Sequence, residues 1–346
     1  MPGIPKETRC GDMVKVYITV DTEVWPNVPD WPHVPLPVDY GGSRAIEWYL
    51  YGGKGPGARG VPYQLDVLAR EGLKATYFVD PMFSFALGLE PLRDVVSAIV
   101  GAGQEVGLHL HPEWLTDPRC KGLPRFAGPL LNGYGEADQS ALIRAGLDRL
   151  AAAGAPPISV FRAGSWGANR VTLKALRDNG IHCDSSLNAR FPASFPDVEG
   201  AVRNAATQPF RLESVAEFPV TSFTDRPPSG RRPLHVCAAS LAEFRLVLEH
   251  AAAESWEAVV IVMHSFEFVR VNRIEGSGTA APQHLLARRF EQICAFLSEN
   301  QSRFQTCHFR DESARATDRV THPPLPCSSR ARTAMRHVEQ IISRLV

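Results

Sequence analysis

The sequence predicts an α/β fold in which parallel strands form a barrel. Apolar runs of strand length alternate with segments whose apolar residues recur at helical spacing. Strands and helices that alternate in this way usually give parallel strands joined by right-handed crossovers. The C-terminal strand ends of an α/β barrel share one face, so polar residues at those ends can form one site. Such residues follow six of the apolar runs: Asp21, Asp80, His109, Arg162, Asp184 and His264.

The first half of the chain alternates between the two kinds of element. Its expected strands are rich in β-branched or aromatic residues, and its expected helices end near glycines. Leu65 and Leu68, for example, share one face of a helix that Gly72 ends. The expected strands are 14–20, 73–79, 104–110, 158–162 and 181–184, and the expected helices are 62–70, 92–100, 136–153 and 170–179.

Long segments without periodicity separate some of these elements. They are a Gly-rich aromatic insertion at 41–60, a Pro-containing loop at 112–135 and an irregular stretch at 188–211. Loops of this length are usually functional or disordered. The aromatic residues of the insertions could line a pocket, or could pack on one another: Trp25, Trp31, Trp48 and Tyr49.

The second half continues the alternation and then changes composition. We expect strands at 215–220, 233–237, 258–263 and 304–309, and helices at 241–253 and 282–297. We therefore place the barrel at 14–310 and a tail at 311–346, which consists of a polar, Pro-rich linker and a short helix. The helix carries Arg332, Arg336 and Arg344 on a basic face. It is expected to pack loosely or fray, with partner binding as the alternative.

Composition excludes several classes of protein. Lys and Arg together number 37, as do Asp and Glu, so the net charge is zero and nucleic-acid binding is not expected. The first residues contain no apolar signal core, and no apolar stretch is long enough for a membrane span. The seven cysteines form no CxxC pair. They are expected to be reduced thiols in a cytoplasmic protein.

Two carboxylates follow the first strand. Asp21 and Glu23 alternate, so an extended chain places them on one side. One of them could bind a divalent cation while the other accepts a proton from water. The alternative for this pair is a solvated strand end. Asp80, before Pro81, is more simply explained as a turn or cap.

Histidines follow the third strand in the segment EVGLHLHPE. His109 and His111 share a side if the strand continues, whereas His109 and Glu113 share a side if a helix begins there. Either pair supplies ligands that zinc accepts. A single histidine would more often be structural, but two at this spacing after a strand favour a metal site.

The remaining polar strand ends suit proton transfer and substrate contact. Arg162 could clamp a carboxylate and hold Asp21 ionised, or could form a surface ion pair. Trp166 could offer a flat face to a sugar ring, or could pack in the core. His264 could protonate a leaving group, or could be a satisfied core histidine.

Read in order, the segments VDTE, EVGLHLHPE, FRAGSWG, CDSS and IVMH resemble those of the polysaccharide deacetylases of the NodB-homology type, carbohydrate esterase family four. The resemblance covers about residues 14–309, and it depends on the order and spacing of the motifs together. It implies a single domain with a distorted (β/α) barrel and a zinc-like divalent metal held by one acid and two histidines. It also implies hydrolysis of an N-acetyl amide on a sugar or glycoconjugate, or of another non-peptide C–N bond.

The motifs depart from the usual pattern of that family. The acidic pair is Asp21-Thr22-Glu23 instead of adjacent Asp-Asp, and the His motif is His109-x-His111, with Glu113 at the usual second-His position. These changes resemble a divergent branch with D-x-E and H-x-H motifs. The resemblance then implies Glu23, His109 and His111 as metal ligands. Asp21 in place of Glu23, and Glu113 in place of His111, remain alternatives.

The resemblance also implies catalytic roles. Asp21 would act as the general base and His264 as the general acid that protonates the departing amine. Arg162 would orient Asp21, and Asp184, in CDSS, would orient His264 or Arg162.

The substrate is expected to be a carbohydrate or another N-acylated small molecule, bound in part by Glu113 and Trp166. An amidase acting on a non-carbohydrate small molecule is the first alternative. A non-catalytic binding protein, suggested by the changed ligand motifs, is the second. Mixed nitrogen and oxygen ligands favour zinc but also suit cobalt, nickel or iron.

Overall fold

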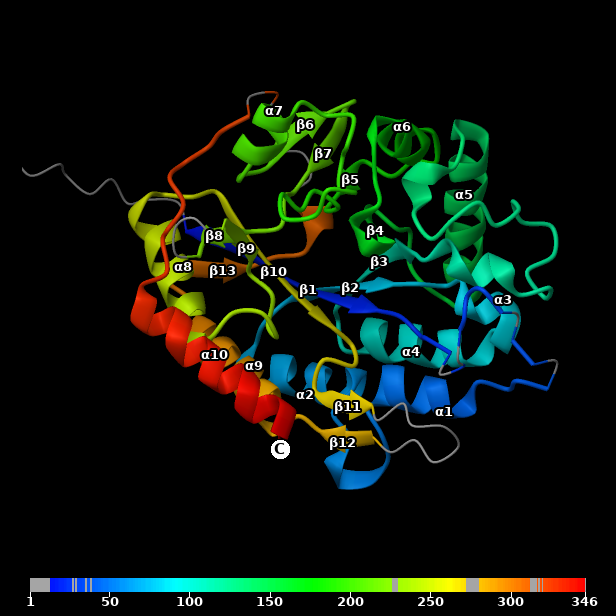
Figure 1. Ribbon diagram of the computed structural model, residues 1–346, viewed down its shortest axis with the longest axis horizontal. Helices are drawn as coiled ribbons and strands as arrows, with labels where there is room; N and C mark the ends of the chain where they lie inside the picture. Colours follow the sequence, from blue (N-terminus) through cyan, green and yellow to red (C-terminus); the bar gives the residue numbers. More distant parts are fainter. Residues whose placement is uncertain are drawn as a thin grey trace, which may run out of the picture.

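The computed structural model describes residues 13–26, 28, 30–34, 36–37, 39–225, 230–271, 280–311, 316, 318 and 320–345. A nine-stranded sheet curls through its centre (Figure 1). All neighbouring strands are parallel except β6 and β7. The strand order is β10 (Ala258–His264), β1 (Val14–Thr22), β2 (Ala75–Val79), β3 (Glu105–Leu110), β4 (Val160–Ala163), β5 (Cys183–Asp184), β7 (Val215–Glu217) and β6 (Phe210–Leu212), with β13 (Phe304–Thr306) also on β1.

Segments outside the sheet cover the free edge of β10 through an irregular seam. Thr221, just after β7, accepts a hydrogen bond from the Val260 N–H at its Oγ1 (2.8 Å) and one from the Leu234 N–H at its carbonyl (2.7 Å). The Val262 N–H then donates to the Leu234 carbonyl (3.1 Å), and the Val236 N–H donates to the Val262 carbonyl (3.0 Å). The curled sheet is thus completed at β10 by single bonds instead of a continuous ladder. This is the distorted α/β barrel that the sequence predicts.

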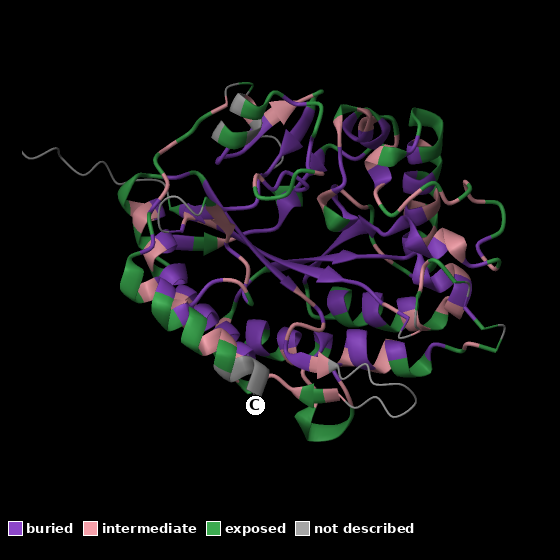
Figure 2. Ribbon diagram, in the orientation of Figure 1, coloured by how far each residue is buried: buried purple, intermediate pink, exposed green. Residues whose placement is uncertain are grey.

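Helices cover the outer face of the barrel, with buried residues toward the sheet and exposed residues on the outer side (Figure 2). The longer ones agree with the predicted ranges to within a few residues. Asn169 and Thr172 form a reciprocal capping box at the start of α6, as Ser240 and Glu243 do for α8. The helices are α1 (Ser43–Ile46), α2 (Val61–Glu71), α3 (Phe83–Leu87), α4 (Glu90–Gly101), α5 (Glu136–Ala152), α6 (Arg170–Asp178), α7 (Gly200–Ala205), α8 (Leu241–Ala253), α9 (His284–Glu299) and α10 (Arg330–Leu345).

Two short antiparallel strand pairs lie outside the barrel sheet. They consist of β8 (Ser222–Thr224) with β9 (Arg231–Pro233), and β11 (Val269–Val271) with β12 (Ala280–Pro282). The pair that contains β9 includes the main difference from the strands expected from the sequence. The strand expected at 233–237 is replaced by the end of β9 and a tight turn, in which the His235 N–H donates to the Pro233 carbonyl (2.9 Å). Only a single bridge, from His235 to Val262, connects this segment with β10.

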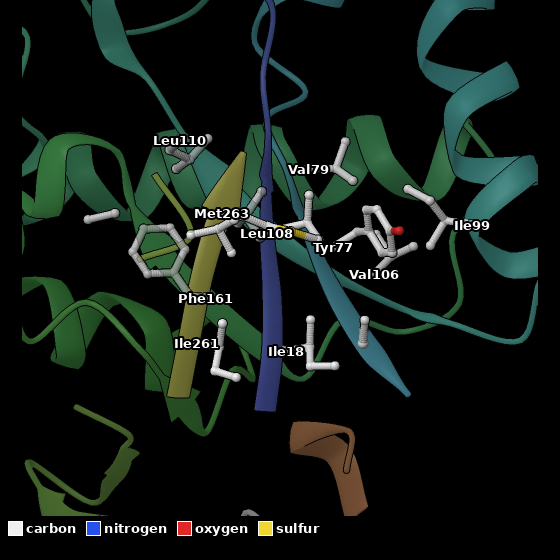
Figure 3. Packing of buried hydrophobic residues seen from close by; sticks show 14 of the residues in the cluster. Ile18, Tyr77, Val79, Ile99, Val106, Leu108, Leu110, Phe161, Ile261 and Met263 are labelled. Atoms are coloured by element: carbon white, nitrogen blue, oxygen red, sulfur yellow. The ribbon is translucent and has the colours of Figure 1, made fainter. Parts of the chain in front are cut away.

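Apolar side chains fill the barrel beneath the strand ends. Leu108, Phe161 and Met263 come from three different strands and are fully buried in one cluster (Figure 3). Strands with apolar residues on both faces have to be covered on both sides. Here the packed interior of the barrel covers one face and the surrounding helices cover the other. The packed layer holds the strands rigidly, and so it also fixes the polar residues that follow them.

Gly107 lies at a point where this packing leaves no room for a side chain. A Cβ atom there would come within 2.8 Å of the Phe78 ring and 2.9 Å of a Val160 methyl group. We expect Gly107→Ala to lower the free energy of unfolding by about 1–3 kcal/mol through overpacking, measured by urea denaturation. Gly101→Ala is the matched control, because a Cβ atom added at Gly101 would meet nothing within 4 Å. Equal stability of both variants would contradict this account of the packing.

The C-terminal helix α10 packs against the barrel, contrary to the expected loose tail. Arg336, placed by the sequence on an exposed basic face, is 0% exposed. Its Nη1 donates to Glu243 Oε1 (2.5 Å) and its Nη2 to Asp225 Oδ2 (2.8 Å). The prediction was wrong because these carboxylates lie about a hundred residues away in sequence, where helical periodicity gives no information. Two buried carboxylates stabilise the buried guanidinium.

Two further expectations concern redox state and membranes. The six cysteines in the described ranges are free thiols, and Cys10 lies outside those ranges. Among the helices that the structure describes, none combines the length and the apolar character needed to cross a bilayer.

Candidate active site

The C-terminal ends of β10, β1, β3 and β4 bring the candidate residues together, with β2 between β1 and β3. Asp21 on β1 is in register with His264 on β10, and His109 on β3 is in register with Arg162 on β4. Glu23 follows directly after β1. The geometry expected from the barrel therefore holds for these residues, which are separated by up to 243 positions in the sequence.

Three side chains, those of Glu23, His109 and His111, converge on one point. Glu23 Oε2 lies 2.6 Å from His111 Nε2 and 3.4 Å from His109 Nε2. The two Nε2 atoms are 3.1 Å apart. All three residues are buried, and they form a group whose ligand atoms lie close enough to share a metal ion.

The orientation of both imidazoles fits a metal. His109 Nδ1 lies 2.8 Å from the Arg162 carbonyl oxygen, and His111 Nδ1 lies 3.3 Å from Glu113 Oε2. With each Nδ1–H donating to these acceptors, each Nε2 presents a lone pair toward Glu23. Two lone pairs that face each other at this distance need a shared cation or a proton. One carboxylate oxygen and two imidazole nitrogens are a donor set that zinc accepts.

Electrostatics in the triad favour a positive charge between its members. Burial lowers the pKa of His111, but the nearby carboxylates of Glu23 and Glu113 outweigh burial and raise the pKa well above its usual range. Burial raises the pKa of Glu23, but His111 and His109 outweigh it and lower that pKa well below its usual range. A bound cation would satisfy the same charge requirement in place of the proton.

Asp21 faces the triad but its carboxylate is held by Arg162. Arg162 Nη1 donates to Asp21 Oδ1 (2.7 Å) and to Thr19 Oγ1 (2.8 Å). The guanidinium is fully buried and lies over the ring of Phe78, 4.2 Å from its centroid. Burial raises the pKa of Asp21, but Arg162 and the histidines nearby lower it overall, so this carboxylate stays ionised.

His264 is held by the carboxylate of Glu267, for which no role was predicted from the sequence. Glu267 Oε2 accepts hydrogen bonds from His264 Nδ1 (3.0 Å) and from the His264 backbone N–H (3.1 Å). His264 Nε2 points toward the triad, 3.8 Å from Glu23 Oε1. Burial lowers the pKa of His264, but Glu267 outweighs it and raises the pKa to about 9. The only sequence signal for Glu267 is its position three residues after the histidine.

Asp184 lies beneath the site, at the end of β5. Its Oδ1 accepts a hydrogen bond from the Ser186 hydroxyl (2.6 Å), which in turn accepts one from the Ala163 N–H (2.9 Å). Glu217 lies beside it on β7. Burial and the Asp184 carboxylate raise the pKa of Glu217 well above its usual range. Asp184 thus contacts Ser186 and Glu217, and its bonds tie β4 to β5.

Asp80 behaves as the turn residue suggested by its position before Pro81. Its Oδ1 accepts a hydrogen bond from the Met82 N–H (3.0 Å). Its Oδ2 is buried without a hydrogen-bond partner, and burial raises the pKa of this carboxyl to about 7. The charges of the triad act on Asp80, but it is not one of the three converging side chains.

Of the insertion aromatics, Trp25 lies beside the triad and Trp31 packs edge-on against Trp25, whereas Trp48 and Tyr49 are buried in the core. The Trp25 ring packs edge-on against His111, with centroids 4.7 Å apart. A cavity of ≈ 630 Å³ opens here. Its walls are Trp25, Pro26, Val28, Asp30, Trp31, Pro32, His33, Glu113, Phe126, Gly128 and Pro129.

The Trp166 ring packs against the Arg162 guanidinium. The residue follows β4 in a turn where both Ser165 and Trp166 have positive φ values, 49° and 61°. Such conformations in residues other than glycine are strained and often occur at functional sites. The partly buried indole lies against the Arg162 guanidinium at 5.3 Å and near the Phe191 ring at 6.0 Å.

Comparison with solved structures finds the same architecture elsewhere. A protein from Mycobacterium smegmatis, provisionally described as a polysaccharide deacetylase, matches with a TM-score of 0.54 and 18% identity, over 94% of this chain and 99% of that one. A 4-α-glucanotransferase from Thermococcus litoralis matches with a TM-score of 0.50 and 9% identity, over 91% of this chain and 42% of that one. A family 4 carbohydrate esterase from Streptomyces lividans, in complex with acetate, matches with a TM-score of 0.41 and 13% identity, over 88% and 96%.

No protein-family model and no curated protein matches the sequence. The structural similarity extends over nearly the whole of both chains in the Mycobacterium smegmatis comparison. One fold can host unrelated chemistry, so function has to be argued from the site. The chain has the distorted (β/α) barrel fold of the polysaccharide deacetylases, the family that its motifs resemble.

Proposed function

We propose that this protein is a metal-dependent hydrolase that removes the acetyl group from an N-acetylated sugar or glycoconjugate. The observation that carries this proposal is the convergence of Glu23, His109 and His111 next to an ionised Asp21 and a protonated His264. A cation site flanked by a candidate base and a candidate acid is what hydrolysis of an amide requires.

Glu23 Oε2, His109 Nε2 and His111 Nε2 would hold the metal, most simply zinc. When bound, a divalent cation polarises the amide carbonyl and lowers the pKa of water. Glu113 and the Arg162 carbonyl fix the two imidazoles through their Nδ1 atoms, so the ligands keep their orientation.

Two residues would move protons on opposite sides of the scissile bond. Asp21, kept ionised and oriented by Arg162, accepts a proton from the attacking water. His264 carries a proton on Nε2 while its Nδ1–H is held by Glu267. It gives the Nε2 proton to the departing nitrogen as the C–N bond breaks, which releases a free amine and a carboxylate. Asp184 acts indirectly, since it fixes the ends of β4 and β5.

Substrate contacts would come from both sides of the triad. Glu113, which lines the cavity, can accept hydrogen bonds from sugar hydroxyls, and Trp166 can stack on an apolar ring face. A second candidate function is favoured by the aromatic walls of the cavity, where Trp25, Trp31 and Phe126 would suit a ring-bearing, non-carbohydrate amide.

An assay of acetate and amine release tests the proposal. The chelator-treated protein, reloaded with zinc or cobalt, is incubated with N-acetylglucosamine oligosaccharides and, in parallel, with aromatic N-acetyl amides. We expect equal amounts of acetate and free amine from the sugars, and none from the metal-free sample. Turnover of the aromatic amides alone would favour the second function. Turnover of neither class by the loaded protein would contradict a hydrolase and leave a binding protein.

A further inference from the structure

A second cluster of metal-ligating side chains lies next to His264, on the side away from the triad. It consists of His235 and Cys237, in the turn before α8, and Glu267, in the turn after β10. The ligand atoms of these residues all lie within 4.8 Å of one another. The chemistry proposed above uses neither His235 nor Cys237.

We propose that His235, Cys237 and Glu267 form a separate binding site for a thiophilic divalent cation of the zinc class. Cys237 Sγ lies 3.0 Å from His235 Nδ1. Glu267 Oε2 lies 3.7 Å from His235 Nε2. This inference stands on its own residues and does not depend on the proposed hydrolase.

Local structure brings these side chains together. The bridge between His235 and Val262 fixes the turn against β10, the strand that leads to Glu267. The His235-x-Cys237 spacing then places both ligands on one side of the turn. A single ion would bind one ring nitrogen of His235, and Nδ1 is the nitrogen that faces Cys237. Zinc forms bonds of about 2.0 Å to nitrogen and about 2.3 Å to sulfur, so ligand atoms that lie within 4.8 Å of one another can reach one ion after small movements. Cys237 is exposed, so it can move and an ion can reach it.

The donor types indicate which cation the cluster would select. A sulfur, a nitrogen and an oxygen donor suit zinc or cobalt, whereas magnesium and calcium prefer oxygen ligands alone. Burial lowers the pKa of His235 and so favours the neutral imidazole that a metal needs. Desolvation and the Glu267 carboxylate raise the pKa of the Cys237 thiol, so the ion itself has to displace the thiol proton. The Cys237 thiol must lose its proton when the ion binds, so binding releases a proton.

The surrounding contacts support the turn that carries these ligands. Arg289 Nη1 donates to the carbonyl of Val236, between the two ligands (2.6 Å). Arg289 Nη2 pairs with Glu339 of α10 (2.7 Å), which partly neutralises the guanidinium next to the cluster. The C-terminal helix therefore braces the proposed site, and an ion there would share Glu267 with His264.

Cobalt titration of the metal-free, full-length protein tests the proposal. A thiolate ligand gives cobalt a near-ultraviolet charge-transfer band, and the Glu23–His109–His111 triad contains no sulfur that could produce it. We expect this band in the unmodified protein and its loss in Cys237→Ser. Cys327→Ser, which removes another exposed thiol, is the matched control and should keep the band.

His109→Ala separates the two sites. It should remove cobalt from the triad but leave the thiolate band, so failure of the triad and failure of the second site are distinguishable. His235→Gln, with the thiol intact, should weaken the cobalt affinity read from the band by at least about tenfold, which provides an answer if Cys237→Ser does not fold. Absence of the band from the unmodified protein, or its survival in a folded Cys237→Ser variant, would overturn the proposal.

Discussion

Replacing His109 with alanine is expected to remove the metal from the Glu23–His109–His111 triad and almost all of the activity. The variant leaves Glu23 and His111 with one nitrogen and one oxygen donor, too few for a tight zinc site. Because the cation would supply several kcal/mol of transition-state stabilisation, kcat should fall by about 10³-fold or more. Elemental analysis in a Cys237→Ser background, which removes the sulfur ligand of the second proposed site, and a single-turnover acetate assay measure the two effects.

His308→Ala is the matched control for this experiment. His308 and His109 are both 2% exposed, but His308 lies next to Gln104, away from the triad. The control should lose stability and keep both metal and activity. If His109→Ala retained a full equivalent of metal in the triad, the ligand assignment would be wrong. Loss of metal from both variants would mean that the effect reports general destabilisation.

Much of the fold and of the triad could be predicted from sequence because both depend on local patterns. The strand that ends at His264, β10, is a continuous apolar run up to that residue, and parallel strands buried on both faces require such runs. Once the strands are located, barrel geometry places Asp21 and His264 on the same face with no further information. The α8 helix was predictable in the same way, from its apolar periodicity and from Ser240 before it.

The parts that could not be predicted depend on contacts between distant residues. Arg336 is an ordinary helix residue until Asp225 and Glu243 are placed beside it. Glu217 ends beside Asp184 only because β7 pairs with β5, across an irregular segment with no periodic pattern. Charge pairing of this kind leaves no trace in the spacing of a single sequence.

The choice among carboxylates also needed coordinates. Asp21, Glu23 and Glu113 are equally plausible ligands by type. The structure separates them by partner, because Asp21 is paired with Arg162, Glu113 contacts His111 Nδ1, and Glu23 alone meets both Nε2 atoms. Each carboxylate thus has a different neighbour, and its chemistry follows from that neighbour.

His264→Ala is expected to lower kcat by roughly 10²–10⁴-fold without removing the metal, because the departing nitrogen loses its proton donor. His264 Nε2 lies 3.8 Å from Glu23 Oε1, outside the converging triad, so the triad should keep its metal. Steady-state kinetics and elemental analysis on the same preparation measure both quantities. Near-normal turnover in the metal-loaded variant would show that another group protonates the amine.

Glu267→Gln tests how His264 is held in its acidic form. The Glu267 carboxylate contributes to raising the pKa of His264 to about 9, so removing its charge should lower that pKa. His264 acts as an acid only below its pKa, and the alkaline limb of kcat/KM should therefore move to lower pH. The acidic limb, set by Asp21, should stay in place, because Asp21 keeps its ion pair with Arg162. The measurement is a pH–rate profile with the triad loaded and no excess metal. An unchanged alkaline limb would mean that this limb reports a group other than His264. Glu267 would then stabilise the turn after β10 and have no effect on the pKa of His264.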